Sequence, residues 1–167
     1  GMGGRVLCGH ACSLAIRPED QVARVMDAAA RAGVALTVNP TTNLYLQDMT
    51  PGRTPRLRGL APVQELRAAG VPVLLGCDNV RDPFYPFGSY DPVEMLRLAG
   101  LVARLPPGDG LDGITAAPAA AMGLPAPGIA VGAPADFITI AGADWTEALS
   151  APRTPRHIHR AHAKAMT

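Results

Sequence analysis

Residues 70–79 read GVPVLLGCDN, an apolar run that ends in a glycine, a thiol, an acid and an amide. The aliphatic residues at 71–75 predict a buried strand, because such runs between turn residues are typical of strands covered on both faces. Asp91 and Pro92 then predict the start of a helix, with Glu94 as the reciprocal capping partner of Asp91. The apolar stripe of this helix consists of Met95, Leu98, Ala99 and Val102. The segment therefore predicts a strand, a loop and a helix.

Two similar units precede this one. The first combines a strand at 5–8 with a helix that begins near Pro18 and ends at Gly33. The second has a strand at 34–38, a long polar loop through Arg58 and a helix at 62–69. The apolar face expected for the first helix consists of Val22, Val25, Met26 and Ala29.

Polar residues follow each predicted strand. Strands that alternate with helices predict a parallel sheet, with helices outside it and functional groups at the carboxyl ends of the strands. His10, Asn39 and Asp78 occupy those positions, so a parallel sheet would bring them to one edge. Each residue alone could equally be a strand-end residue that satisfies backbone groups of a turn, as Asn and Asp often do.

The overall composition excludes several classes of protein. Of 167 residues, 48% are hydrophobic and 17% charged, which predicts a compact domain rather than a disordered chain. A formal net charge of +1 gives no field that would favour nucleic acid as a partner. No run approaches the ~20 apolar residues of a membrane-spanning helix, so we expect no membrane insertion. Three cysteines without a Cys-x-x-Cys pair, and no secretory signal pattern, predict a cytoplasmic location.

The loop at 82–87, DPFYPF, combines two prolines with three aromatic residues. Prolines restrict the backbone and aromatic rings provide apolar area, a combination suited to the wall of a pocket for a flat ligand. Phe84 is the candidate for that contact. The same loop could instead simply cover the end of the sheet.

Four segments stand in this order along the chain: GHAC at 9–12, VNPTTNLYLQ at 38–47, GCDNVRDPFYPFG at 76–88 and GIAVGAPADFITI at 128–140. Together they resemble cytosine deaminases of the amidohydrolase superfamily. The resemblance implies a (β/α)8 barrel with one catalytic zinc or iron, which activates water to attack a ring carbon bearing an amino group, or a lactam. We therefore expect an α/β fold that contains about the last three βα units of such a barrel.

The resemblance also predicts the domain organisation. We expect a partial (β/α) barrel at 5–124, and a C-terminal β-segment with a short helix at 125–150. The strand in this segment would belong to the β-sandwich of the superfamily. A mobile tail is expected at 151–167.

The resemblance implies roles for single residues. Asp78 matches the metal-binding carboxylate at the end of the eighth strand, which also accepts a proton from the nucleophilic water. His10 matches the sixth-strand histidine, which polarises the metal-bound hydroxide or the substrate. Asn79 stands where better-known cytosine deaminases carry an acid; an amide can bind a heterocycle but carries no charge, which puts cytosine itself in doubt as the substrate. Asn39 and Gln47 fall in the segment that lines the substrate pocket.

The resemblance begins at the sixth strand, so the first five strands and their metal ligands have no counterparts here. A catalytic zinc usually has about three protein ligands, and we therefore expect the isolated chain to hold zinc or iron weakly or not at all. His157, His159 and His162 have a spacing known from zinc sites. They lie in a Pro- and Arg-rich tail, however, where a solvated segment is the favoured interpretation.

Two functions remain open at this stage. One is a cytosine deaminase-like enzyme that acts on a small heterocyclic substrate, such as a cyclic amidine or nucleobase, once the missing strands are supplied. The other is a non-catalytic remnant that serves as a binding or oligomerisation module. In either case an uncovered sheet edge favours a homo-oligomer or a complex with a separate N-terminal half.

Overall fold

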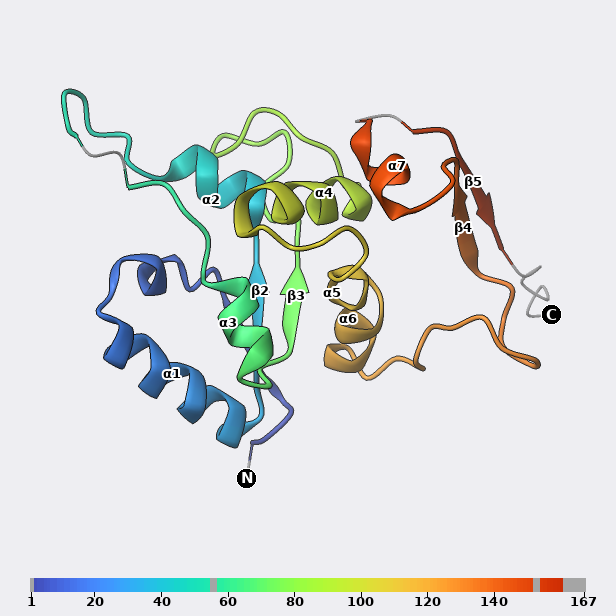
Figure 1. Cartoon of the computed structure of the whole chain (residues 1–167), viewed down its shortest axis with the longest axis horizontal. Coiled ribbons are helices and arrows are strands. Elements are labelled where there is room, and N and C mark those ends of the chain that lie inside the picture. Colours follow the sequence, from blue (N-terminus) through green and yellow to red (C-terminus); the bar gives the residue numbers. More distant parts are fainter. Residues whose placement is uncertain (1, 55–56, 152–153, 161–167) are drawn as a thin grey trace.

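The computed structural model describes residues 2–54, 57–151 and 154–160. Its centre is a three-stranded parallel sheet in the order β1 (Val6–Gly9), β2 (Val34–Val38) and β3 (Val73–Leu75). Val6 pairs with Val34 and Leu36 with Val73, so all three strands end at the same edge. Figure 1 shows this edge at the top of the sheet. The α/β fold expected from the strand and helix alternation is confirmed.

Helices cover the face of the sheet from which the side chains of Leu36, Val38 and Val73 project into the core. The elements on this side are α1 (Glu19–Ala32), α3 (Val63–Ala68) and α4 (Pro92–Ala103). Many of the most deeply buried side chains belong to β2, α3 and α4, and these include Val38, Val63, Leu66, Met95 and Leu96. On α1, Val22 is buried but Val25 is 47% exposed, so the predicted apolar face of this helix is narrower than its spacing suggested.

The helix boundaries follow from capping. Gly33 ends α1 in the left-handed conformation (φ 64°), which a glycine adopts without strain. Asp91 caps α4 as predicted, because its Oδ1 accepts a hydrogen bond from the Val93 N–H at 3.0 Å. Glu94 is not the reciprocal capping partner of Asp91 that the sequence predicted. Its carboxylate instead accepts a hydrogen bond from the Ser89 hydroxyl at 2.6 Å.

Two local predictions are wrong. The segment after β2 is not a loop throughout: Pro40–Leu46 forms helix α2, with Pro40 at the first helical position. Strand β3 begins at Val73 rather than Val71, because Pro72 has no N–H to donate to a ladder. A short 3-10 helix, η1 (Cys12–Ile16), connects β1 to α1.

The chain then forms α5 (Leu111–Ile114), α6 (Ala116–Ala121), β4 (Phe137–Ile140), α7 (Trp145–Ser150) and β5 (Arg156–His159). Strands β4 and β5 pair antiparallel, with Phe137 opposite His159 and Thr139 opposite His157. The mobile tail expected at 151–167 is therefore wrong for residues 156–159, which supply β4 with a partner from the same chain. Arg156 links this pair of strands to the start of α4 through an ion pair, since its Nη1 lies 2.5 Å from Oδ2 of Asp91.

Strand β1 is the exposed edge of the sheet. All four of its residues are exposed, including Val6 at 36% and Leu7 at 51%. Within the described residues, β1 pairs only with β2. None of the helices in the described part of the chain is both long and apolar enough to cross a membrane.

Candidate functional site

His10 directly follows β1, and its backbone is held in an unusual conformation. His10 and Ala11 both have positive φ angles, 66° and 51°, which non-glycine residues seldom adopt. The His10 N–H donates to the carbonyl oxygen of Thr37 at 2.8 Å, extending the ladder between β1 and β2. Left-handed residues of this kind often occur at functional sites, because surrounding contacts compensate for their cost.

Asp78 lies three residues beyond the end of β3 and also has a positive φ, 57°. The N–H of Gly76 donates to the Val38 carbonyl oxygen at 2.9 Å. The hydroxyls of Thr41 and Thr42, in the first turn of α2, both donate to the Cys77 carbonyl oxygen at 3.3 Å. The first turn of α2 therefore fastens the end of β3 to the end of β2 and places the Asp78 carboxylate.

The two candidate catalytic side chains lie close together. Nε2 of His10 is 3.7 Å from Oδ2 of Asp78, and the side chains are 48% and 29% exposed. One follows β1 and the other follows β3, so the pair spans the carboxyl-terminal edge of the whole sheet. An imidazole next to a carboxylate is an arrangement suited to proton transfer.

Two amides lie against the other side of the His10 ring. Asn39, which follows β2, is buried, and its Nδ2 lies 3.5 Å from Nδ1 of His10. Asn43 of α2 is equally buried, and its Nδ2 lies 2.7 Å from the same ring nitrogen. The sequence interpretation missed Asn43, since it placed this segment in a loop. The i, i+4 spacing of Asn39 and Asn43 would have put both amides on one face of a helical turn.

The other predicted substrate-binding amides are engaged in the surrounding loops. Nε2 of Gln47 donates to the Gly59 carbonyl oxygen at 2.8 Å, and its Oε1 accepts from the Gly59 N–H at 2.6 Å. Nδ2 of Asn79 donates to Oδ2 of Asp82 at 2.6 Å. This hydrogen bond, together with those from the Tyr85 and Phe84 N–H groups, lowers the pKa of Asp82.

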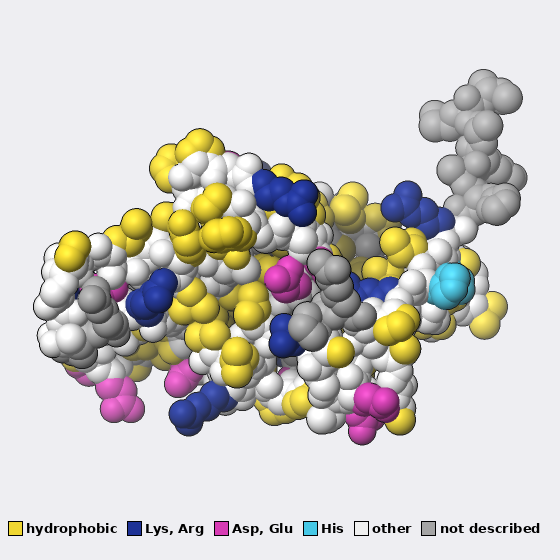
Figure 2. Space-filling view, turned by 90° about the horizontal axis from the view of Figure 1, so that it is seen from above, with side chains coloured by type: hydrophobic (Ala, Val, Ile, Leu, Met, Phe, Trp, Pro, Cys, Tyr) yellow, Lys and Arg dark blue, Asp and Glu magenta, His cyan; other side chains and the backbone are white. Residues whose placement is uncertain are grey.

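An aromatic cluster lies beside the site. The rings of Tyr45, Tyr85 and Phe87 contact one another edge to face, with centroids 5.1 to 6.2 Å apart. Phe84, the residue predicted to contact a flat ligand, is 63% exposed. Figure 2 looks onto the end of the molecule where the parallel strands finish and shows hydrophobic side chains spread over much of that face.

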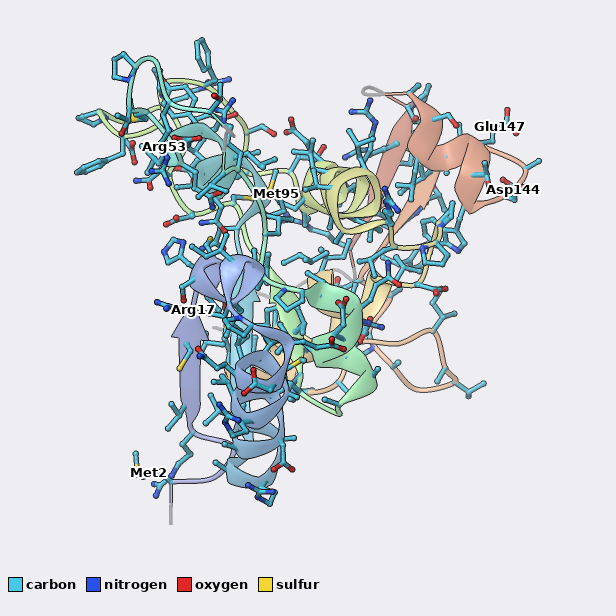
Figure 3. All side chains as sticks on the ribbon, turned by 60° about the vertical axis from the view of Figure 1, so that its left-hand side comes forward. Met2, Arg17, Arg53, Met95, Asp144 and Glu147 are labelled. Carbon is cyan, nitrogen blue, oxygen red and sulfur yellow. The ribbon has the colours of Figure 1, made fainter. Side chains whose placement is uncertain are left out.

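The described residues do not form a complete metal site. No group of three or more His, Cys, Asp or Glu side chains in this part of the chain could hold an ion. The rings of His157 and His159 lie 6.1 Å apart on β5, and His159 stacks on Phe137; His162 falls outside the described residues. Asp144 caps α7 and Glu147 lies within that helix, both away from the parallel sheet, as Figure 3 shows. Asp78 and His10 therefore fit only as part of a larger donor set.

The thiols near the site do not favour nucleophilic chemistry. Burial raises the pKa of Cys12 and of Cys77, and the carboxylates of Asp91 and Glu94 raise that of Cys77 further. A raised pKa reduces the thiolate fraction that nucleophilic attack requires. Both side chains are better explained as packing residues.

Several known proteins are similar to this chain over most of its length. A pterin deaminase of Rhizobium rhizogenes is 44% identical over 163 residues, which cover 96% of this chain and 37% of the relative. The crystal structure of a 5-methylcytosine deaminase from Klebsiella pneumoniae liganded with phosphonocytosine matches with a TM-score of 0.78 at 27% identity. That match covers 89% of this chain and 37% of the other.

A third relative is an N-isopropylammelide isopropylaminohydrolase from Burkholderia multivorans. Its structure matches with a TM-score of 0.70 at 28% identity, covering 89% of this chain and 36% of that one. The chain thus spans little more than a third of the length of these relatives. The sequence profile described as "Amidohydrolase family" matches residues 1–162. The chain therefore belongs to the amidohydrolase family.

Proposed function

We propose that this chain contributes His10 and Asp78 to the active site of a hydrolytic deaminase that acts on a flat amino-heterocycle. Water would add to the ring carbon, the C–N bond would break, and ammonia would leave as a carbonyl forms. The site would be completed by barrel strands outside this sequence. The observation that carries the proposal is the 3.7 Å approach of His10 and Asp78 at the carboxyl edge of a parallel sheet.

Deaminases of this family generally use a metal ion, and zinc or iron is the metal that we propose. Asp78 would be the one ligand from this chain, and the ion would supply activation of water. His10 and Asp78 have complementary tasks of their own. The carboxylate holds a proton at Oδ2, and the imidazole orients the substrate or water in front of it.

The proposed substrate is a bicyclic amino-heterocycle of the pterin type. Identity is 44% to the pterin deaminase but 27% to the 5-methylcytosine deaminase. Asn79 carries no charge at a position where, by resemblance, cytosine deaminases have an acid. Phe84 offers an exposed ring suited to stacking on a flat ligand, and Asn39 and Gln47 would lie along the pocket.

The exposed edge of β1 supports the partial-barrel interpretation. Val6 and Leu7 are partly or largely exposed there, and unpaired strand edges favour pairing with further strands. We propose that additional strands of a (β/α)8 barrel pair with this edge. They could belong to the same polypeptide, to a separate N-terminal half, or to a second copy in a homo-oligomer.

A second candidate function is a non-catalytic binding or oligomerisation module. The observation that favours it is that the described residues contain no group of three or more His, Cys, Asp or Glu side chains that could hold an ion. Such a module would still use the β1 edge to associate, but it would bind no ion.

Co-expression with the region of the R. rhizogenes pterin deaminase that this chain does not match would separate the two functions. Metal content would be measured on the purified complex, and deamination of pterin and of cytosine would be followed by ultraviolet absorbance. We expect about one zinc or iron per complex and faster turnover of pterin. A well-formed complex that binds metal but deaminates neither compound would contradict the proposed enzyme, and Asp78→Asn serves as the inactive control.

A further inference from the structure

The Asn43 side chain lies against the edge of the His10 ring opposite to Asp78. Its Nδ2 is 2.7 Å from Nδ1 of His10, and its Oδ1 accepts a hydrogen bond from the Asn39 backbone N–H at 3.3 Å. A backbone N–H can only donate, so the amide atom that faces it is the oxygen. The NH2 group therefore faces His10, and because NH2 also only donates, Nδ1 must be the acceptor.

A second amide lies near the same ring nitrogen. Asn39 Nδ2 is 3.5 Å from Nδ1, and Asn39 Oδ1, on the side of Gly76, has no hydrogen-bond partner among the described residues. The Asn43 amide, whose oxygen is fixed by the Asn39 N–H, therefore carries the assignment. A proton on Nδ1 would meet the Asn43 NH2 group instead of an acceptor. The neutral ring is thus left with its proton on Nε2, the nitrogen that faces Asp78.

We propose that Asn43 is a positioning residue that selects the Nε2–H tautomer of His10. In this tautomer the ring presents a hydrogen-bond donor to the space in front of Asp78, so a substrate nitrogen or oxygen there can accept from Nε2. The opposite tautomer would direct a lone pair toward the Asp78 carboxylate. The catalytic consequence rests on the proposed function, but the tautomer is a property of this chain alone.

The surroundings of Asn43 restrict the orientation of its side chain. It is 5% exposed, and it lies in the turn of α2 whose neighbouring hydroxyls, Thr41 and Thr42, hold the Cys77 carbonyl. The Thr42 hydroxyl also accepts from the Asn79 N–H at 3.1 Å. The network that places Asp78 therefore also fixes the amide that orients His10.

The test is two-bond ¹H–¹⁵N correlation spectroscopy of the histidine rings in the uniformly labelled chain, at a pH where histidine is neutral. A His10→Gln variant identifies the His10 signals by their loss. We expect Nδ1 at the shift of an unprotonated ring nitrogen and Nε2 at that of a protonated one. A protonated Nδ1 in the unmodified chain would overturn the inference, and this measurement does not depend on activity.

Asn43→Asp provides the complementary measurement. A carboxylate at this position would accept a hydrogen bond from Nδ1–H, so Nδ1 should move to the shift of a protonated nitrogen. Unchanged shifts in a folded Asn43→Asp variant would contradict the role of Asn43. Gln64→Glu is the matched control: it makes the same amide-to-carboxylate change on α3, where the Gln64 side chain donates to the carbonyl oxygens of Ala103 and Arg104, and it should leave both shifts unchanged.

Kinetics of the completed enzyme connect the tautomer to function. Asn43→Asp should lower kcat by roughly 10²-fold or more, within the range lost when a general acid or base is disabled, while KM changes less. Spectra that show Nε2–H in a complex with no deaminase activity would support this inference and count against the proposed function alone. An active enzyme whose kcat is insensitive to Asn43→Asp would count against the inference alone.

Discussion

Nε2 of His10 lies 3.7 Å from Oδ2 of Asp78, although the two residues follow opposite edge strands of the sheet. The approach depends on β2 between them, whose last residues anchor both ends. Thr37 accepts a hydrogen bond from the His10 N–H, and Val38 accepts one from the Gly76 N–H. The register of the three strands therefore brings the two residues to the same edge of the sheet.

Asp78→Asn should separate function from stability. Asparagine tolerates the positive φ of this position, and the pair is partly exposed, so the free energy of unfolding should change by less than about 1 kcal/mol. In the completed enzyme we expect kcat to fall by roughly 10²-fold or more. Urea unfolding and steady-state kinetics measure the two effects. A large loss of stability without loss of turnover would contradict the assigned role.

Gly76→Ala should disturb the site through Asn39. An added Cβ would lie 2.5 Å from Asn39 Oδ1 and 2.9 Å from Thr37 Cγ2, so both neighbours must shift. We expect destabilisation of about 1–3 kcal/mol, as in other overpacked positions, together with altered His10 ring signals. Gly9→Ala is the control at the end of β1, where nothing lies within 4 Å of the added atom, and it should stay within about 0.5 kcal/mol.

The lowered pKa of Asp82 gives a prediction for pH. Its ionised form is favoured in the folded chain, so the resulting stability is fully present above the ordinary value of 3.8 and is lost as pH falls through the lowered pKa. Asn79→Ala removes the largest cause and should move the pKa of Asp82 back toward 3.8. A carboxyl ¹³C NMR titration measures this shift. Identical Asp82 titrations in the two proteins would show that Asn79 does not control it.

Arg156→Met tests the ion pair that links strands β4 and β5 to the start of α4. The Arg156–Asp91 pair is 22% and 28% exposed, and its loss should cost about 1 kcal/mol and accelerate hydrogen exchange in β4 and β5. Arg24→Met breaks the more exposed Asp20–Arg24 pair within α1 and should cost no more than about 0.5 kcal/mol. Equal effects of the two substitutions would contradict the structural importance of Arg156.

The sequence predicts the central sheet well for clear physical reasons. Residues 34–38 form β2 as expected, because a β-branched run stands between Gly33 and the Asn39–Pro40 pair. His10, Asn39 and Asp78 could be placed at one edge because parallel strands end together. The contact distance could not be predicted, since it depends on left-handed residues at positions 10, 11 and 78.

Helix α2 and strand β5 could not be predicted, because their local composition is not typical of the structure that they form. Helix α2 is rich in polar residues that are typical of a loop, yet its threonines and Asn43 are buried by contacts with Cys77, after β3, and with His10. Strand β5 follows two prolines and carries two histidines, and it is stabilised by its pairing with β4 and by the Arg156–Asp91 ion pair. Both errors have one cause: tertiary contacts override local preference.

The Asp91 carboxylate is shared between distant parts of the chain. One oxygen caps α4 and the other pairs with Arg156, while the same charge raises the pKa of Cys77, the neighbour of Asp78. A protein shortened before Arg156 would thus leave an uncompensated negative charge near Cys77 and the proposed site. Removal of the C-terminal end of the chain would therefore first change the electrostatic environment of Cys77 and Asp78, at the end of the central sheet.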